Sequence, residues 1–240
     1  MRDYLLDLVE HTFDLGCIDL VKIVGSDADT QIVGLAEDQS VVVLGNYKNP
    51  VPDFIGTFGM PNLAKLKTLL NLQEYREDAK LTITRRTTGE PDGIAFENKV
   101  GDFKNNYRFM AAEIVKEKLK TPKFAGVNWH ITFEPTNAAI QRLKWQMSAN
   151  LEEPNFTAKT DGGDLKFSFG DHSTHSGNFI FHPGIDGQLK RAWAWPAKQF
   201  ASILDLTGDK TVQISNDGAA QITVDSGLGV YKYILPAQSK

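Results

Sequence analysis

Cysteine is nearly absent from this chain, since Cys17 is the one cysteine among 240 residues. No intrachain disulfide can therefore form, and a zinc site built on several thiolates is excluded. The first residues, MRDYLLDLVEHTFDLG, carry acids inside their apolar stretch. They match neither the uninterrupted core of a signal peptide nor a membrane span. We therefore expect an intracellular, cytoplasmic protein with no membrane partner.

An excess of positive charge is also missing. The 26 Lys and Arg residues face 30 Asp and Glu residues, which gives a formal net charge of -4. A protein that coats nucleic acid through its overall charge needs a basic surface to displace counterions, so that class is excluded. A local basic face is still allowed. Apolar residues make up 41% of the chain, as in a globular protein with a full core, so disorder is not expected.

The signatures of common catalytic sites are missing as well. No serine lies in a Gly-x-Ser-x-Gly turn, and Cys17 follows a glycine at a predicted helix end, where a packed residue is expected. There is no phosphate-binding glycine loop, because Gly25, Gly34 and Gly45 are spread among separate predicted strands. These absences weigh against nucleophilic catalysis and against a phosphate-binding loop.

What the chain does contain is a repeat. The segment FGMPNLAKLKTLLNL from Phe58 aligns with WAWPAKQFASILDL from Trp193. In both, an aromatic and a large apolar residue precede a proline, Pro61 or Pro196, where a helix is predicted to begin. With one residue of slippage the apolar stripes also match: Leu66, Leu69, Leu70 and Leu72 correspond to Phe200, Ile203, Leu204 and Leu206.

The similarity extends on both sides of these helices. Downstream, each copy has two strand-like runs around an Asp-Gly pair, which predicts a hairpin turn at Asp92-Gly93 and at Asp217-Gly218. Each copy closes on an aromatic-basic-aromatic strand, at residues 107–109 and 231–233. Upstream, each begins with an amphipathic helix, near residues 4–15 and 136–151, followed by antiparallel strands.

The repeat defines the expected domains. We place an N-terminal domain at residues 1–110 and a C-terminal domain at residues 129–240. Between them, the strand pattern lapses over residues 111–128, where Pro122 and Gly126 interrupt it. This segment is predicted to be an interdomain linker.

Two such units in one chain resemble the sliding clamps of DNA replication. The resemblance rests on the paired aromatic-x-apolar-Pro helices, the mid-chain linker and the C-terminal strand VYKYILPAQ, and it spans nearly the whole chain. It implies an α+β fold with two tandem copies of the DNA-clamp fold, each with two helices packed on antiparallel sheet, assembling into a closed ring. Two-domain subunits of this family form trimers, so the length implies a homotrimer. The short loops and the C-terminus are most like the clamps of T4-type phages, which would act in the host cell cytoplasm.

The family resemblance also implies a function. Such a ring encircles double-stranded DNA regardless of sequence and tethers the DNA polymerase and other clients, which confers processivity. The resemblance also implies a protein that acts by binding, is not an enzyme and needs no cofactor. A separate ATP-dependent clamp loader places such a ring on DNA.

Clamp helices turn their polar faces toward DNA, so the residues opposite each apolar stripe are candidates. In the helix near 136–151, Ile140, Leu143, Met147 and Leu151 are predicted to share the inward face. Taken alone, each polar face is more simply an ordinary solvated surface, and only the resemblance favours phosphate contact. The DNA-facing candidates are Lys65, Lys67, Arg142, Lys144, Trp145 and Lys198.

The first helix departs from this pattern. Its apolar stripe is predicted to be Leu5, Leu6, Val9 and Phe13, which leaves Asp7, Glu10, His11 and Asp14 on the opposite face. An acidic face would repel DNA. Three explanations stay open: the helix sits differently, Arg2 compensates, or the predicted register is wrong.

Clamps hold short client peptides in a hydrophobic pocket walled by the linker and by the residues after the last strand. Client peptides would insert apolar and aromatic anchors there. The same residues could instead simply seal the junction between the domains. Carried over to this chain, the candidates are Ile114, Val115, Leu119, Phe124, Leu235, Pro236 and Ala237.

Two other functions compete with this one. A metal-dependent hydrolase could use Asp171, His172, His175 and His182 as ligands, although these residues lie in a Gly/Ser/Thr-rich segment that is more typical of a polar hairpin loop. We therefore expect no metal. Trp193 and Trp195 alternate along a predicted strand, as in a ligand-binding platform or a virion β-protein, but their repeat partners Phe58 and Met60 favour core packing.

Overall fold

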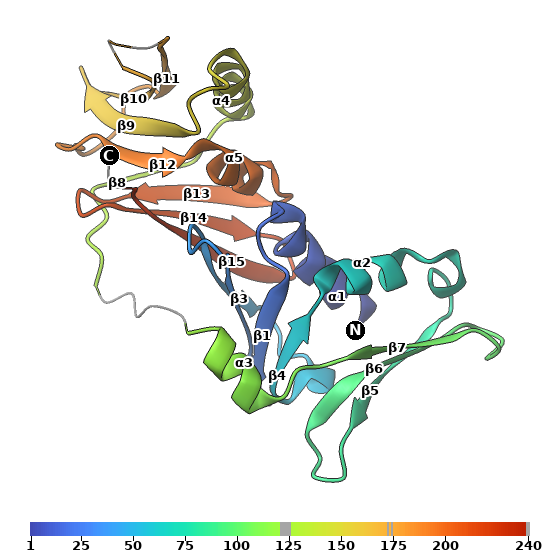
Figure 1. The fold of residues 1–240 in the computed structure, drawn as a ribbon. Helices are drawn as coiled ribbons and strands as arrows, with labels where there is room; N and C mark the ends of the chain where they lie inside the picture. The colour runs from blue at the N-terminus through green and yellow to red at the C-terminus, as the bar shows by residue number, and fades with distance from the viewer. Residues whose placement is uncertain (121–125, 172, 174, 239–240) are drawn as a thin grey trace. The chain divides into compact units, whose positions relative to one another are not determined.

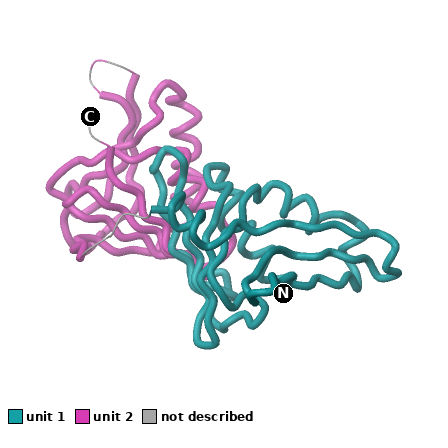
Figure 2. The backbone as a smooth tube through the Cα atoms, turned by 60° about the horizontal axis from the view of Figure 1, so that its bottom comes forward, with its two compact units in different colours: residues 1–122, 226–231 teal, residues 123–225, 232–240 magenta. Residues whose placement is uncertain are grey.

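The computed structural model describes residues 1–120, 126–171, 173 and 175–238, which form two compact units (Figure 2). Unit 1 comprises Met1–Pro122 together with Ser226–Tyr231, and unit 2 comprises Lys123–Asp225 together with Lys232–Lys240. The last strand, β15 (Gly229–Pro236), is thus divided between the two units. Within the described ranges, no helix is long and apolar enough to cross a membrane.

Unit 1 combines two contacting helices with two antiparallel sheets (Figure 1). The first sheet has the strand order β4-β1-β2-β3, and the segment Ser226–Tyr231 lies beside β3, where the Lys48 N–H donates to the Leu228 carbonyl (2.9 Å). The second sheet has the order β5-β6-β7. The elements are α1 (Arg2–Glu10), β1 (Leu20–Gly25), β2 (Thr30–Leu35), β3 (Val42–Tyr47), β4 (Gly56–Pro61), α2 (Leu63–Asn71), β5 (Lys80–Arg85), β6 (Pro91–Glu97), β7 (Lys104–Arg108) and α3 (Ala112–Lys118), with short 3-10 turns at Phe13–Leu15, Pro52–Phe54 and Gln73–Tyr75.

Unit 2 repeats this plan. One sheet has the order β11-β10-β9-β12, and the other places β15 beside β14, then β13 and β8. Helices α4 and α5 contact each other, as α1 and α2 do in unit 1. The elements are β8 (Ile131–Phe133), α4 (Asn137–Ala149), β9 (Asn155–Asp161), β10 (Asp164–Phe169), β11 (Gly177–His182), β12 (Trp193–Pro196), α5 (Ala197–Asp205), β13 (Asp209–Ile214), β14 (Ala219–Asp225) and β15.

The two units share one topology, which confirms the predicted duplication. The order β4-β1-β2-β3 in unit 1 corresponds strand by strand to β12-β9-β10-β11 in unit 2. Each sheet follows a first helix, α1 or α4, and its fourth strand in sequence leads into a second helix, α2 or α5. Three further strands then complete each copy. The α+β class, with helices on antiparallel sheets, is also confirmed.

Aromatic residues fill both cores because they alternate with polar residues along the strands. In β10 the buried positions are Leu165, Phe167 and Phe169. The ring of Phe167 stacks on that of Phe181, with a centroid distance of 4.2 Å. In unit 1 the equivalent role falls to Phe58, whose ring stacks on that of Phe109 at 4.3 Å. The Phe167 ring also lies near the Phe200 ring of α5, with a centroid distance of 5.9 Å.

One of the two predicted hairpin turns is wrong. Asp92 and Gly93 lie inside β6, and the chain reverses before it, where the Arg86 N–H donates to the Glu90 carbonyl and Gly89 has a φ of 87°. Gly93 serves packing instead, since a Cβ there would lie 2.4 Å from the Tyr107 carbonyl oxygen. The second prediction is confirmed, because Gly218 (φ 81°) turns the chain between β13 and β14.

Three predicted helix ends also need correction. Pro61 ends β4 and Pro196 is the N-cap of α5, so neither proline occupies the first helical position. Helix α4 ends at Ala149, where the Asn150 backbone and side chain both donate to the Gln146 carbonyl. Leu151 therefore leaves the inward stripe and is 84% exposed, contrary to prediction. The segment predicted as the linker, residues 111–128, contains α3.

Candidate nucleic-acid interface

Helix α2 presents the predicted polar face. Leu63, Leu66 and Leu70 are buried, while Lys65 and Thr68 are exposed on the other side. The helix begins after Asn62, whose side chain accepts a hydrogen bond from the Lys65 N–H (3.1 Å) and so satisfies one of the free first-turn donors. No ion pair involves the Lys65 ammonium within the described ranges. Its charge is therefore available to an anion.

Lys67 stands on the flank of the same helix and differs from Lys65. Its Nζ lies 2.7 Å from the Asp14 carboxylate and 5.9 Å from the centre of the Phe13 ring. Asp14 thus compensates much of its charge. Unit 2 contains a comparable ion pair, in which the Nζ of Lys144 on α4 lies 2.5 Å from the Asp205 carboxylate of α5. The lysine of this pair belongs to the first helix of its unit, whereas Lys67 belongs to the second helix of unit 1.

Helix α5 repeats the stripe of α2. Phe200, Ile203 and Leu204 are buried and Lys198 is exposed, as predicted from the sequence. In the part of the chain that the structure describes, Lys198 has no carboxylate partner. Lys65 and Lys198 are therefore the two uncompensated lysines among the candidates.

Helix α4 contributes an arginine and a tryptophan. The Arg142 guanidinium donates to the Ile180 carbonyl (3.2 Å) and lies 5.3 Å from the centre of the Phe179 ring, so β11 holds it in place. Trp145 is 64% exposed. An exposed indole beside a positioned guanidinium offers a flat apolar face and donors to a polyanion. The structure brings Arg142, Lys144 and Trp145 onto one helix but pairs only Lys144 with an acid.

The predicted face of α1 is wrong. Leu5, Leu8 and Val9 are buried, but so are Asp7 and His11, which were expected on the outer side. The Tyr231 hydroxyl donates to the Asp7 carboxylate (2.6 Å), and the His11 ring stacks on the Tyr231 ring (4.6 Å). The Asp7 carboxylate points inward because a hydroxyl from the last strand satisfies it, and the His11 Nδ1 lies 2.9 Å from the Asp7 carbonyl oxygen.

Burying Asp7 changes the charge that α1 presents. Asp3 and Asp14 are exposed, Glu10 is half-buried, and Asp14 is already paired with Lys67. Arg2 does not stand free to offset them, because its guanidinium donates to the Leu70 carbonyl (2.6 Å). The register explanation therefore removes one of the three acids, Asp7, from the apparent acidic face.

The client-pocket candidates divide between the two units. In unit 1, Val115 and Leu119 are buried and Ile114 is half exposed; Val115 packs on Gly59, where a Cβ would lie 2.8 Å from its Cγ2. Phe124 lies outside the described residues.

The remaining client-pocket candidates belong to unit 2. Leu235 is buried, Pro236 is exposed and Ala237 is half-buried. The Ala237 N–H donates to the Gly218 carbonyl (2.8 Å), which holds the residue beside the turn that joins β13 to β14. Ile114 of unit 1 and Pro236 of unit 2 are thus the candidates with the most accessible apolar surface.

No protein-family model matches the sequence, and no curated protein sequence matches it. Solved structures do match. PCNA from Thermococcus kodakaraensis superposes with a TM-score of 0.67 over 99% of this chain and 97% of its own, at 12% identity. A. fulgidus PCNA, in a structure with the C-terminal region of FEN-1 bound, superposes with a TM-score of 0.69 over 98% of this chain and 96% of its own, at 10% identity. This chain has the PCNA-type sliding-clamp fold.

In the described residues, neither the metal-ligand candidates nor the two strand tryptophans are arranged as a ligand-binding site. Asp171 bonds within its own turn, accepting from the Ser173 N–H (2.8 Å) and hydroxyl (2.6 Å), while the His182 ring packs near Phe133 (5.1 Å). His172 lies outside the described residues. Among the residues that are described, no three His, Cys, Asp or Glu side chains gather where they could hold a metal ion.

The two strand tryptophans do not form a platform in the clamp fold. Trp195 is fully buried, whereas Trp193 is half-buried and its Nε1 donates to the Asn216 carbonyl (2.7 Å). A ligand platform would need both indole faces accessible. Their burial agrees instead with the core role of the repeat partners Phe58 and Met60, which are also buried.

Proposed function

We propose that this protein is a sliding-clamp subunit that encircles double-stranded DNA as a ring and tethers a DNA polymerase and other clients. The observation that carries the proposal is the clamp fold of the whole chain, with its duplicated units. The protein acts by binding and needs no catalytic group or cofactor. Within the family, its short loops and C-terminus favour the T4-type phage clamps.

The proposed DNA contact uses the outer faces of α2, α4 and α5. Lys65 and Lys198 provide uncompensated charge, Arg142 provides a positioned guanidinium, and Trp145 provides an exposed indole. Lys67 and Lys144 add less, since each is paired with an aspartate. Such groups meet phosphates without reading base edges, so binding would be weak, salt-dependent and independent of sequence. That weakness permits sliding.

Ring closure needs a joint between subunits, and the duplication indicates where it lies. In unit 1 the edge strand β3 is covered by the segment Ser226–Tyr231. Its counterpart in unit 2, β11, has no further strand beside it in the described residues, and β7, the counterpart of β15, is also a sheet edge. Pairing β11 of one subunit with β7 of the next would satisfy both edges and repeat around a homotrimer.

Client segments would dock on the apolar residues of α3 and of the chain end. Ile114 and Pro236 offer accessible apolar surface, and Val115 anchors α3 to β4. The A. fulgidus PCNA structure holds the C-terminal region of FEN-1, a protein segment of the kind proposed here. An ATP-dependent loader would open the ring on closed DNA.

Two measurements test the proposal. Light scattering coupled to gel filtration should give a particle of about three times the 26.6 kDa chain mass. A ring threaded over a linear duplex should then stay on it at high salt when both ends are blocked by streptavidin, and leave once a nuclease cuts the duplex. A monomer at micromolar concentration, or equal loss from blocked and open DNA, would contradict the proposal.

A further inference from the structure

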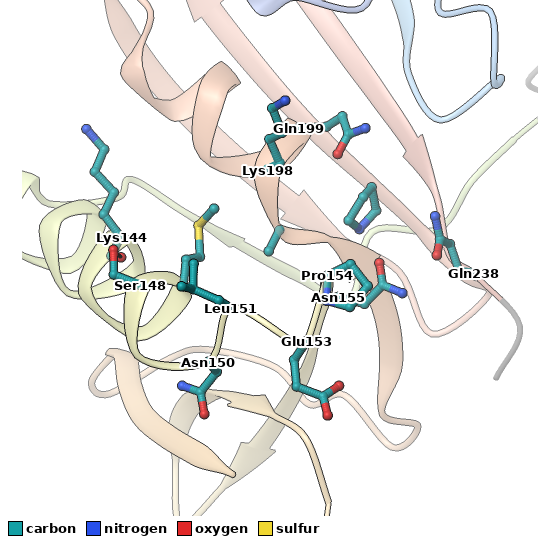
Figure 3. A pocket seen from close by; sticks show the side chains of 13 residues that line it. Lys144, Ser148, Asn150, Leu151, Glu153, Pro154, Asn155, Lys198, Gln199 and Gln238 are labelled. Carbon is teal, nitrogen blue, oxygen red and sulfur yellow. Dashed lines mark hydrogen bonds between the residues drawn. The ribbon is translucent and has the colours of Figure 1, made fainter. Parts of the chain in front are cut away.

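A cleft of about 690 Å³ opens within unit 2, between the end of α4 and the start of α5 (Figure 3). Its walls are the last turn of α4, the connection from α4 to β9, the first turn of α5, and Gln238, whose N–H donates to the Ala194 carbonyl of β12. Its volume is in the range of sites that hold small molecules or the anchoring side chains of a peptide. None of the client-pocket candidates lines it.

The cleft has an apolar floor. Met147, Leu151, Pro154 and Ala197 contribute to it, and Figure 3 shows Leu151 in the middle of the cleft. Because α4 stops at Ala149, the Leu151 side chain is carried out of the core and almost fully exposed. A cluster of apolar side chains around a concave surface marks an interaction site better than a single exposed leucine does.

The wall formed by α5 is positive. Lys198 extends from this wall and has no ion-pair partner in the described residues. The helix begins without a side-chain cap and without an acid in its first turn, and the N–H of Ala197, its first residue, donates to the Pro154 carbonyl (2.9 Å). The positive end of the helix dipole adds to the charge of Lys198 and favours an anion there.

The opposite wall adds little negative charge. Lys144 lines this wall, and its Nζ is paired with Asp205, which does not line the cleft. Glu153 is the one carboxylate among the lining residues, and Figure 3 shows it at the far side of the cleft from Lys198. An occupant therefore needs apolar groups for the floor and negative charge toward α5.

We propose that this cleft is a docking site for an acidic segment of a partner protein that carries an apolar anchor. The anchor would cover Leu151 and Met147. Flanking carboxylates would pair with Lys198, beside the positive end of the α5 dipole. Apolar anchoring provides most of the affinity of such contacts, and the charges select the partner and its orientation.

The test uses the full chain and a fluorescein-labelled peptide in which two leucines are flanked on each side by two glutamates. Fluorescence anisotropy should show saturable binding with a Kd of about 10–100 µM. Leu151→Ser and Lys198→Glu should each weaken binding about tenfold, because they remove the anchor contact and reverse the charge. Matched controls lie in unit 1: Val100→Ser removes another exposed aliphatic side chain (75% exposed), and Lys116→Glu reverses another exposed helical lysine, and both should leave the Kd unchanged.

Several outcomes would overturn the proposal. These are an absence of saturation up to about 1 mM, a Kd unaffected by Leu151→Ser, or equal binding of a peptide with lysines in place of the glutamates. A fall in native mass caused by Leu151→Ser would instead identify a second copy of the chain as the occupant. The measurement needs neither DNA nor a closed ring, so its result is independent of the clamp proposal.

Discussion

The hydroxyl of Tyr231 donates a 2.6 Å hydrogen bond to the carboxylate of Asp7, although 224 positions separate the two residues. Both are buried, and the His11 Nδ1 lies 3.4 Å from the same carboxylate. A polar network inside unit 1 thus ties the first helix to the last strand. It explains why an acid that sequence periodicity places on the outer face of α1 is turned inward.

This hydrogen bond should contribute measurably to stability. Tyr231→Phe keeps the ring but leaves a buried carboxylate without its donor, which should lower the free energy of unfolding by about 1–3 kcal/mol. Urea unfolding followed by circular dichroism measures the change. Asp3→Asn alters an exposed carboxylate of the same helix and should shift the midpoint little. An unchanged midpoint for Tyr231→Phe would show that the bond adds no net stability.

Buried tyrosines should make the protein sensitive to alkali. Burial, with a smaller effect of nearby Asp19, raises the pKa of Tyr107 well above the ordinary value of 10.0, and burial also raises the pKa of Tyr47 and Tyr231. Above pH 10 the unfolded chain releases these protons while the folded chain retains them. The stabilising contribution is therefore complete below pH 10 and falls by about 1.4 kcal/mol per pH unit for each such tyrosine.

Tyr107 provides the variant that checks this pH dependence. Its hydroxyl donates to the Pro61 carbonyl (2.5 Å), so Tyr107→Phe should cost about 1 kcal/mol at neutral pH. Between pH 10 and 11, however, the variant should lose stability less steeply than the unsubstituted protein. Urea titrations at closely spaced pH values give both slopes. Identical slopes would mean that Tyr107 does not contribute to the alkaline transition.

The six DNA-facing candidates should not contribute equally. Lys65 and Lys198 are uncompensated, whereas Lys67 and Lys144 are paired with Asp14 and Asp205. Replacing Lys65 and Lys198 together by alanine should weaken DNA binding more than replacing Lys67 and Lys144. The slope of log K against log salt should become shallower by about 0.9 for each phosphate that the variant no longer neutralises.

Salt-dependent anisotropy with a labelled duplex measures these slopes. Lys116→Ala is a suitable control, because this exposed lysine lies on α3, which carries none of the six candidates. Equal losses for the two lysine pairs would show that the ion pairs do not limit the DNA contact. A loss as large for Lys116→Ala would place the DNA elsewhere.

If subunits join through β11, a new charge on β11 should lower the native mass, whereas a new charge on β3 should not. Ile180 of β11 and Leu44 of β3 are both 36% exposed and occupy corresponding strands of the two units. Ile180→Asp should drive the particle toward the 26.6 kDa chain mass, because β11 is the edge left for a neighbouring subunit. Leu44→Asp should leave the mass unchanged. Light scattering over a concentration series distinguishes the two, and the reverse pattern would move the joint to another edge.

Local sequence patterns predicted the parts of this fold that depend on neighbouring residues. The leucine stripe of α2 and the apolar stripe of α5 lie where their periodicity places them, and Lys65 and Lys198 are exposed accordingly. Periodicity did not reveal α3, because Val115 is the one buried residue of this helix and its sequence carries little periodic signal. The prediction failed at Leu151, because the Asn150 cap ends α4 before the stripe does.

The sequence by itself determined the duplication, the α+β class and the outer faces of α2 and α5, since each follows from periodicity and order along the chain. The tertiary structure decided which charges remain free. Lys67 meets Asp14 across 53 positions, and Asp7 meets Tyr231 across 224. Partners so distant along the chain leave no local pattern, because only folding brings them within hydrogen-bonding distance.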